Sequence, residues 1–277
     1  MAGRRILNRI ALAALVALAI IWSLAPYLWT LFTSFKTERE LYQFPVTYLP
    51  KVPTIINYVN VFTQNPFGRF LLNSAIVTVL STVLCLFIAS LAAYAFARLK
   101  FRGREPLLVG LLVVAMIPLI TLIVPLYILV RKLGLLNTYW GLIAPYVTYS
   151  LPVAIFILTA FFREIPPELE EAALIDGCTR MNTLWRIIAP LAAPGLITAG
   201  IIVFVYTWNE FLIAMTLTST TGVRTITVGI ALYRGEFTFP WGVISAAVAL
   251  ATVPIMALIL LGQRLVIRGL TAGAVKG

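Results

Sequence analysis

Long apolar stretches, separated by short polar segments, dominate the pattern of the chain. Six stretches carry no Asp, Glu, Lys or Arg: 10–35, 70–97, 106–130, 133–162, 187–209 and 237–263. A helix rises about 1.5 Å per residue, so about 20 residues cross a hydrocarbon core about 30 Å thick. The stretches are apolar on all sides, whereas the strands of a membrane barrel alternate apolar with polar residues. The pattern predicts an all-α polytopic membrane protein with six transmembrane helices.

Composition excludes a soluble protein with the same helices buried. Of the 277 residues, 61% are hydrophobic and 11% are charged, against about 25% charged in an ordinary soluble domain. Six core helices would need an amphipathic shell around them, and the remaining sequence is too short to build one.

The distribution of basic residues predicts the orientation. Thirteen of the 21 Lys and Arg fall on the N-terminus, 98–105, 163–186 and the C-terminus, and eight fall on 36–69, 131–132 and 224–236. The positive-inside rule places the first set in the cytoplasm. We therefore expect an uncleaved first span and both termini in the cytoplasm. The net charge of +11 then reflects loops facing anionic lipid rather than a nucleic-acid site.

The chain offers few residues for catalysis or metal binding. There is no His, and neither Cys85 nor Cys178 has a neighbour at metal-ligand spacing. The sequence therefore predicts no catalytic residue and no metal or cofactor bound by this chain.

Most of the acidic residues on the cytoplasmic side lie in one segment, 163–190. Pro166 and Pro167 stand where a helix would begin, and Glu168, Glu170 and Glu171 follow in its first turns, where carboxylates oppose the positive helix end. Gly177 is the expected stop, and a second short helix is expected over 179–189. This hairpin is either a solvated surface loop or a docking surface for a soluble partner.

The segment resembles the EAA loop of permeases of ATP-binding-cassette (ABC) importers. Glu171-Ala172-Ala173 is followed at the family spacing by Gly177, then by Ile187, Ile188 and Pro190, with Ala189 where the pattern has Leu. The second stretch, from Asn73 to Arg98, and Trp208-Asn209-Glu210-Phe211 are similar to carbohydrate importer permeases. The C-terminus resembles that of the shorter, six-span subunit of maltose-type systems.

The resemblance implies a domain plan and a set of partners. The plan is an N-terminal helix and extracytoplasmic loop over 1–69, an ABC importer type I transmembrane core over 70–264, and a cytoplasmic tail over 265–277. The partners are a second, non-identical permease, two nucleotide-binding ATPase subunits, an extracytoplasmic sugar-binding protein and the lipid bilayer of a prokaryotic inner membrane. ATP and Mg²⁺ belong to the ATPase, since the chain has no GxxxxGK[ST] loop.

The resemblance also assigns residues to the coupling contact with the ATPase: Glu171, Ala172, Ala173, Asp176 and Gly177. A translocation path is expected to include Asn209, Glu210, Tyr149 and Ser150, because polar groups inside hydrocarbon are costly and often functional. Glu210 is either a path residue or a carboxylate wetted at the end of a span.

The expected function is a permease subunit for import of a di- or oligosaccharide, which forms half of the path and transmits ATPase movement. Import of glycerol-3-phosphate or another polyol by the same mechanism is an alternative. A stand-alone secondary transporter is a further alternative, although we find no intramembrane ion pair and no clear repeat. A membrane enzyme is least supported by the residue types present.

Overall fold

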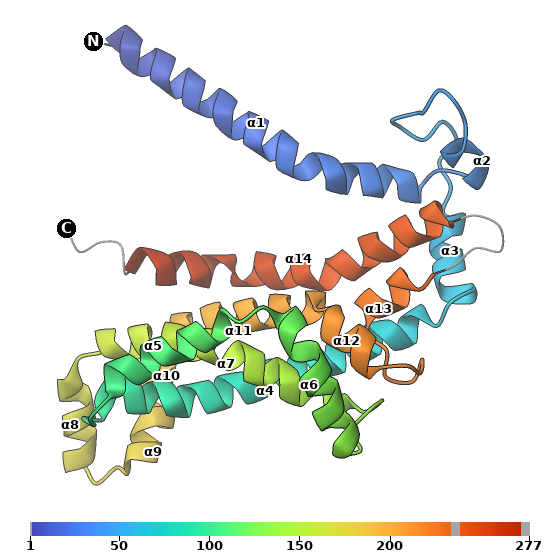
Figure 1. The fold of residues 1–277 in the computed structure, drawn as a ribbon. Helices are drawn as coiled ribbons and strands as arrows, with labels where there is room; N and C mark the ends of the chain where they lie inside the picture. Colours follow the sequence, from blue (N-terminus) through green and yellow to red (C-terminus); the bar gives the residue numbers. More distant parts are fainter. Residues whose placement is uncertain (1, 234–238, 273–277) are drawn as a thin grey trace. The chain divides into compact units, whose positions relative to one another are not determined.

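Every regular element in the described part of the chain is a helix, so the prediction of an all-α polytopic membrane protein is confirmed. The computed structural model describes residues 2–233 and 239–272, and side chains over 8–233 and 239–262 (Figure 1). Four helices there are long and apolar enough to cross a membrane, and two bent pairs raise the total to six if each pair is one span. The predicted spans therefore fall on four continuous helices and two broken ones.

The chain forms two compact units, Met1–Gly68 with Ile230–Val253, and Arg69–Gly229 with Pro254–Gly277. The domain plan expected from the sequence stays a prediction. The helices, in order, are α1 (Ala2–Ser34), α2 (Glu38–Leu41), α3 (Ile56–Thr63), α4 (Phe67–Arg98), α5 (Arg104–Ala115), α6 (Leu119–Lys132), α7 (Tyr139–Glu164), α8 (Pro167–Ile175), α9 (Arg180–Thr183), the π-helix η1 (Leu184–Ile188), α10 (Ala189–Leu191), α11 (Ala193–Asn209), α12 (Leu212–Leu217), α13 (Ile226–Ala231) and α14 (Trp241–Ala272).

The third apolar stretch is predicted as one span, in which Pro118 and Pro125 favour kinks. It divides into α5 and α6, which meet at an angle of 90°. The break falls at Pro118, which has no backbone N–H to continue the helix and adopts an extended ψ of 126°. Pro125, in contrast, lies within α6 without interrupting it.

The fourth stretch begins its helix later than its apolar pattern suggests. Gly134 and Asn137 both have positive φ, 70° and 57°, so residues before Tyr139 form a turn instead. Thr138 then caps α7 by accepting a hydrogen bond from the Gly141 amide at 3.0 Å. Inside its unit α7 is the central helix, packed by both α5 and α11, and its largest fully buried side chains include Tyr146 and Phe162.

The fifth stretch is broken as well. Residues Arg180–Leu191 and α11 meet at 82°, and the break falls between Pro190 and Pro194. The predicted second cytoplasmic helix over 179–189 is present but irregular, since α9 runs into η1 and then α10. The sequence predicts Leu184, Trp185 and Ile188 as its apolar side. Leu184 and Ile188 are buried, whereas Trp185 is 40% exposed and stacks on Phe87 with ring centroids 5.4 Å apart.

The expected tail lies partly in the last helix and partly outside the described residues. α14 extends to Ala272, so it continues past the predicted span end at Gln263. Residues 273–277 and Arg234 lie outside the described part. Lys276 and Arg234 are among the basic residues from which the orientation is predicted.

Candidate functional site

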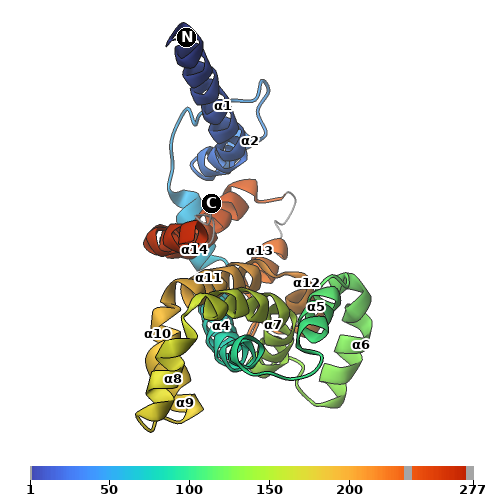
Figure 2. The ribbon, with the colours of Figure 1, turned by 90° about the vertical axis from the view of Figure 1, so that its left-hand side faces the viewer.

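The segment 163–190 begins with a helix whose start follows from its sequence. Pro166 precedes α8 with an extended ψ of 129°, and Pro167 takes the first helical position, where a missing N–H costs nothing. Glu168 and Glu170 stand in the first turn, where they oppose the positive end of the helix. Figures 1 and 2 both place α8 beside α9 at one end of the second unit.

The same helix ends at Gly177, as predicted. Gly177 has a φ of +83°, a conformation that residues with a Cβ rarely adopt. The Cys178 amide donates to the Ala173 carbonyl at 2.9 Å and the Gly177 amide donates to the Leu174 carbonyl at 3.1 Å. This is the Schellman pattern, which satisfies carbonyls that the helix end would leave unpaired. The glycine therefore sets the direction in which the chain leaves α8.

A buried ion pair ties α8 to the end of α4. The Arg98 Nε lies 3.2 Å from the Glu170 Oε2, and the two side chains are only 9% and 12% exposed. The Tyr94 hydroxyl donates to the other oxygen of Glu170, and the Arg98 Nη2 donates to the Ile165 carbonyl at 2.7 Å. One arginine thus joins the last turn of α4, the junction between α7 and α8, and α8 itself. We call Tyr94, Arg98 and Glu170 the anchor.

Sequence reasoning missed Glu170 as the inward-facing carboxylate. A usable signal was present, because Glu170 and the buried Ala173 are three residues apart and therefore share a helix face. Glu171 lies on a different face and is exposed.

The structure divides the predicted coupling residues between an inner and an outer face of α8. Ala173 is buried with the anchor, whereas Glu171, Ala172, Asp176 and Gly177 are exposed. The outer surface also carries apolar side chains, among which Ile175 is 85% exposed. We call the exposed residues Glu171, Ala172, Ile175 and Asp176 the coupling face. An exposed helix with small and apolar side chains can enter a groove of another protein closely.

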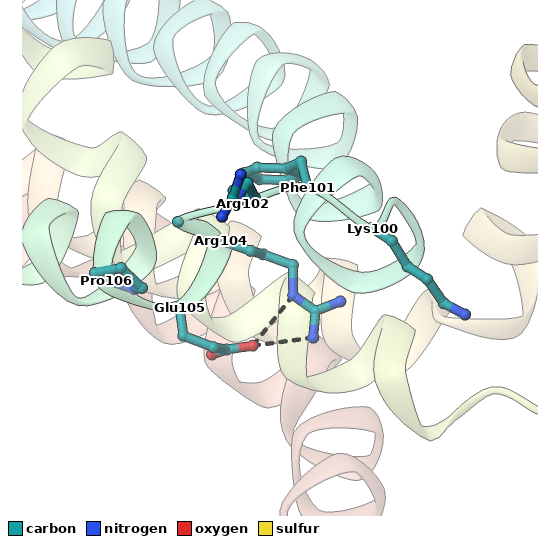
Figure 3. A pocket seen from close by; sticks show the side chains of 7 residues that line it. Lys100, Phe101, Arg102, Arg104, Glu105 and Pro106 are labelled. Carbon is teal, nitrogen blue, oxygen red and sulfur yellow. Dashed lines mark hydrogen bonds and ion pairs between the residues drawn. The ribbon is translucent and has the colours of Figure 1, made fainter.

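A basic turn lies between α4 and α5, near the anchor in sequence. Residues Lys100–Pro106 line an open hollow of about 630 Å³ (Figure 3). Glu105 forms ion pairs with Arg104 at 3.1 Å and with Arg163 at 2.7 Å. The second pair joins the end of α7 to the start of α5. In Figure 3 the Lys100 side chain points away from Arg104 and Glu105. The turn therefore fastens helix ends together rather than converging on a ligand.

The predicted path residues do not form one lining. The Glu210 carboxylate is buried at the break between α11 and α12, where it accepts hydrogen bonds from the Tyr146 hydroxyl at 2.8 Å, the Ile213 amide at 2.8 Å and the Ala214 amide at 3.1 Å. Its backbone carbonyl accepts from the Thr227 hydroxyl at 2.8 Å. Glu210 thus caps α12 and joins it to α7 and to the start of α13, and it is not wetted at a span end.

The other three path candidates have different surroundings. Asn209 is exposed, and its Nδ2 donates to the Val205 carbonyl at 2.8 Å. Tyr149 stacks on Tyr206 with ring centroids 5.2 Å apart. Ser150 is buried beside that pair, and its hydroxyl has no partner in the described part of the chain. The path role of all four residues stays a prediction.

No group of three or more His, Cys, Asp or Glu within the described residues is placed to hold a metal ion.

Comparison with known proteins gives a family match and close relatives. The model of the family described as "Binding-protein-dependent transport system inner membrane component" matches residues 85–272. The sulfoquinovosyl glycerol transport system permease protein SmoH of Agrobacterium fabrum is 48% identical over 261 residues, which are 94% of this chain and 92% of that protein. The trehalose transport system permease protein SugB of Mycobacterium tuberculosis is 41% identical, over 96% of this chain and 97% of that protein.

The fold is also similar to a solved structure. A chain in the crystal structure of a bacterial ABC transporter involved in the import of the acidic polysaccharide alginate superposes with a TM-score of 0.80. The match covers 94% of this chain and 96% of that chain at 23% sequence identity. At that identity the likeness concerns the fold.

Proposed function

Because the chain belongs to the family of binding-protein-dependent transport system inner membrane components, we propose that it forms half of the membrane path of an ATP-driven importer for a di- or oligosaccharide. The family consists of membrane permease subunits that are not themselves catalytic. Among the relatives, two are named for transport of sulfoquinovosyl glycerol and trehalose, both of which contain sugar rings. These names support a saccharide over a free polyol as the substrate. The family membership argues against a stand-alone transporter.

The proposal includes the partners expected from the family resemblance. A second permease completes the path, an extracytoplasmic binding protein delivers the sugar, and two ATPase subunits supply ATP and Mg²⁺ chemistry in the cytoplasm. Both termini of this chain are then cytoplasmic, and α8 with α9 lies on the ATPase side.

Coupling is proposed to run through α8. The observation that carries this is the division of α8 into two faces: the anchor binds Glu170 on the inner face, while Glu171 and Ile175 are exposed on the outer face. A docked ATPase would contact the coupling face, and a movement of α8 would be transmitted to α4 through Arg98. A buried ion pair transmits displacement well because separating its charges in a poorly solvated site is costly.

The experiment is reconstitution of the whole transporter in proteoliposomes with ATP inside and sugar-loaded binding protein outside. We expect uptake that requires both, and uptake without ATP would contradict the proposal. The variant Glu171→Lys is expected to lower uptake at least about tenfold while the assembled complex still purifies, since a like-charge or misfitted contact of this kind costs on the order of 1.4 kcal/mol or more. The matched control is Glu164→Lys, an exposed carboxylate outside α8, which should transport normally.

A further inference from the structure

A pocket in the first unit contains none of the residues of the sites described above. It has a volume of about 410 Å³ and lies where the C-terminal end of α1 and α2 meet the N-terminal end of α14. This volume falls within the range of about 300–1,000 Å³ that is usual for small-molecule sites. Its lining includes Trp29, Trp241, Lys36, Glu40, Thr33 and Ser245.

Two tryptophans form the apolar walls. Trp29 is 42% exposed and Trp241 is 51% exposed, so each ring keeps part of its surface open. Each has an aromatic neighbour that restrains it: Tyr48 packs edge-on against Trp29 with centroids 5.8 Å apart, and Phe239 stacks on Trp241 at 5.5 Å. Restrained rings with an open surface are suited to contact the C–H face of a ligand without a large entropy cost.

A cation and a carboxylate supply the polar part of the lining. Lys36 and Glu40 are only 3% and 7% exposed. Both are fixed by the same residue, since the Lys36 ammonium donates to the Thr47 carbonyl and the Thr47 hydroxyl donates to Glu40 Oε1 at 2.6 Å. The Lys51 amide also donates to that oxygen, at 3.0 Å.

These bonds leave hydrogen-bonding capacity on both groups. The bond from Thr47, and then that from the Lys51 amide, hold the pKa of Glu40 below its ordinary value, so the group is an acceptor near neutral pH. The Lys36 ammonium, which also lies 4.9 Å from the Trp29 ring centroid, has three donors. Within the described residues, the second oxygen of Glu40 accepts no hydrogen bond. A ligand here meets a fixed donor and a fixed acceptor side by side.

We infer that this pocket is a saccharide site, which holds one pyranose ring of a neutral sugar between Trp29 and Trp241, with its hydroxyls on Lys36 and Glu40. A sugar ring has an apolar C–H face for the tryptophans and hydroxyls that both donate and accept. A phosphate headgroup of a lipid is less suitable, because Glu40 would repel it. The inference rests on the proposed function, and the topology predicted from the basic residues puts this end of α1 and α14 on the extracytoplasmic side. The site would receive sugar on the side where a binding protein delivers it.

The test measures sugar binding to the complete transporter in nanodiscs, in the absence of its binding protein. Binding is detected by saturation-transfer NMR. The probes are trehalose and maltose. We expect Trp29→Ala and Trp241→Ala each to raise the dissociation constant about tenfold, since loss of one aromatic contact is worth about that factor. The matched control is Trp22→Ala, which removes an 81% exposed tryptophan from the same helix α1, outside the pocket. It should bind as the unchanged protein does.

Three results would overturn the inference: no saturation transfer to either sugar, equal affinity in the two pocket variants and the control, or stronger binding of glycerol 3-phosphate than of trehalose. If an alanine variant fails to assemble, Trp241→Phe is used instead, because it keeps the packing. It should raise the dissociation constant by less than the factor expected for Trp241→Ala. Stimulation of ATP hydrolysis by sugar-loaded binding protein is measured on the unchanged complex in parallel. Stimulation without direct sugar binding would refute the pocket alone, whereas absent stimulation would count against the proposed function.

Discussion

Two buried carboxylates in the second unit are held in opposite ways. Glu170 is paired with the Arg98 guanidinium and bridges α8 to α4, helices that are far apart in sequence. Glu210 is held by one hydroxyl and two backbone amides, and the amides belong to residues three and four positions later. The first links separate elements through charge, whereas the second holds a helix break through neutral donors, two of them local amides and one the Tyr146 hydroxyl of α7.

The difference indicates different roles in a transporter. A bridge between elements is suited to passing movement along, because a displacement of one helix acts on the other through the ion pair. A carboxylate that caps a helix start preserves the local shape of the chain in every state. We therefore expect changes at Glu210 to affect stability first and changes at the anchor to affect coupling first.

The largest effect is expected at Glu210. Glu210→Ala leaves the Tyr146 hydroxyl and two amides without their acceptor, and each buried unsatisfied group costs about 1–3 kcal/mol. We predict a loss of about 4 kcal/mol in the free energy of unfolding, measured by SDS titration in mixed micelles. Glu210→Gln retains a carbonyl acceptor and should lose less than half as much. Asn209→Ala, the exposed neighbour, is the control, and a loss at Asn209 equal to that at Glu210 would contradict the capping role.

The next effect is expected at the anchor. Arg98→Ala leaves Glu170 nearly buried and unpaired, which we expect to cost about 2 kcal/mol and to lower uptake more than it lowers assembly. Arg98→Lys should recover only part of the uptake, because a lysine cannot contact Glu170 and the Ile165 carbonyl from two fixed nitrogens. The comparison is made as uptake per assembled complex. Normal coupling in Arg98→Ala would remove the distinction between the two carboxylates.

A smaller effect is expected where α8 ends. Gly177→Val forces a residue with a branched Cβ into a left-handed conformation, at a cost of about 1–2 kcal/mol. It should redirect the chain toward α9 and reduce uptake. Gly177→Asn is the matched variant, because asparagine tolerates positive φ better and should retain more uptake. Equal uptake in both variants would indicate that the exit direction from α8 is unimportant.

The smallest effect concerns a third carboxylate, Glu40, outside the spans. Its folded pKa is lowered, so its contribution to stability is fully present above the ordinary carboxylate pKa of about 4.3 and is lost as the pH falls through the folded pKa. Thr47→Val removes the largest cause of the shift and should move this loss to higher pH. Thermal unfolding between neutral pH and about pH 3 measures this loss of stability. The control is Thr63→Val, because the Thr63 hydroxyl donates to the Val59 carbonyl within α3. An identical pH profile in Thr47→Val and the unchanged protein would contradict this assignment.

The sequence predicts the helical class and much of the hairpin over 163–190 because both depend on local patterns. Apolar length fixes the spans, and Pro167 and Gly177 act on the residues next to them, so the bounds of α8 were predictable. The 90° bend between α5 and α6 was not, since Pro118 and Pro125 look alike in sequence and only one of them interrupts the helix.

The sites were less predictable because they depend on contacts between distant residues. Nothing local to Glu170 identifies Arg98 as its partner, and nothing local to Glu210 identifies Tyr146. The apolar pattern around Glu210 indicated a costly buried charge and suggested a path residue, whereas its oxygens are occupied within the chain. Helical spacing from Ala173 offered the one local clue to the orientation of Glu170.

The central claim, that the outer face of α8 docks the ATPase, is tested most directly by site-specific photo-cross-linking. A photoreactive phenylalanine analogue is introduced in place of Ile175, which is 85% exposed on the coupling face, or in place of Leu133, which is 62% exposed beyond the end of α6 on the predicted opposite side. Irradiation of the assembled transporter is predicted to join the ATPase subunit to position 175 and not to position 133. A cross-link to the ATPase from position 133, or none from position 175, would contradict the account.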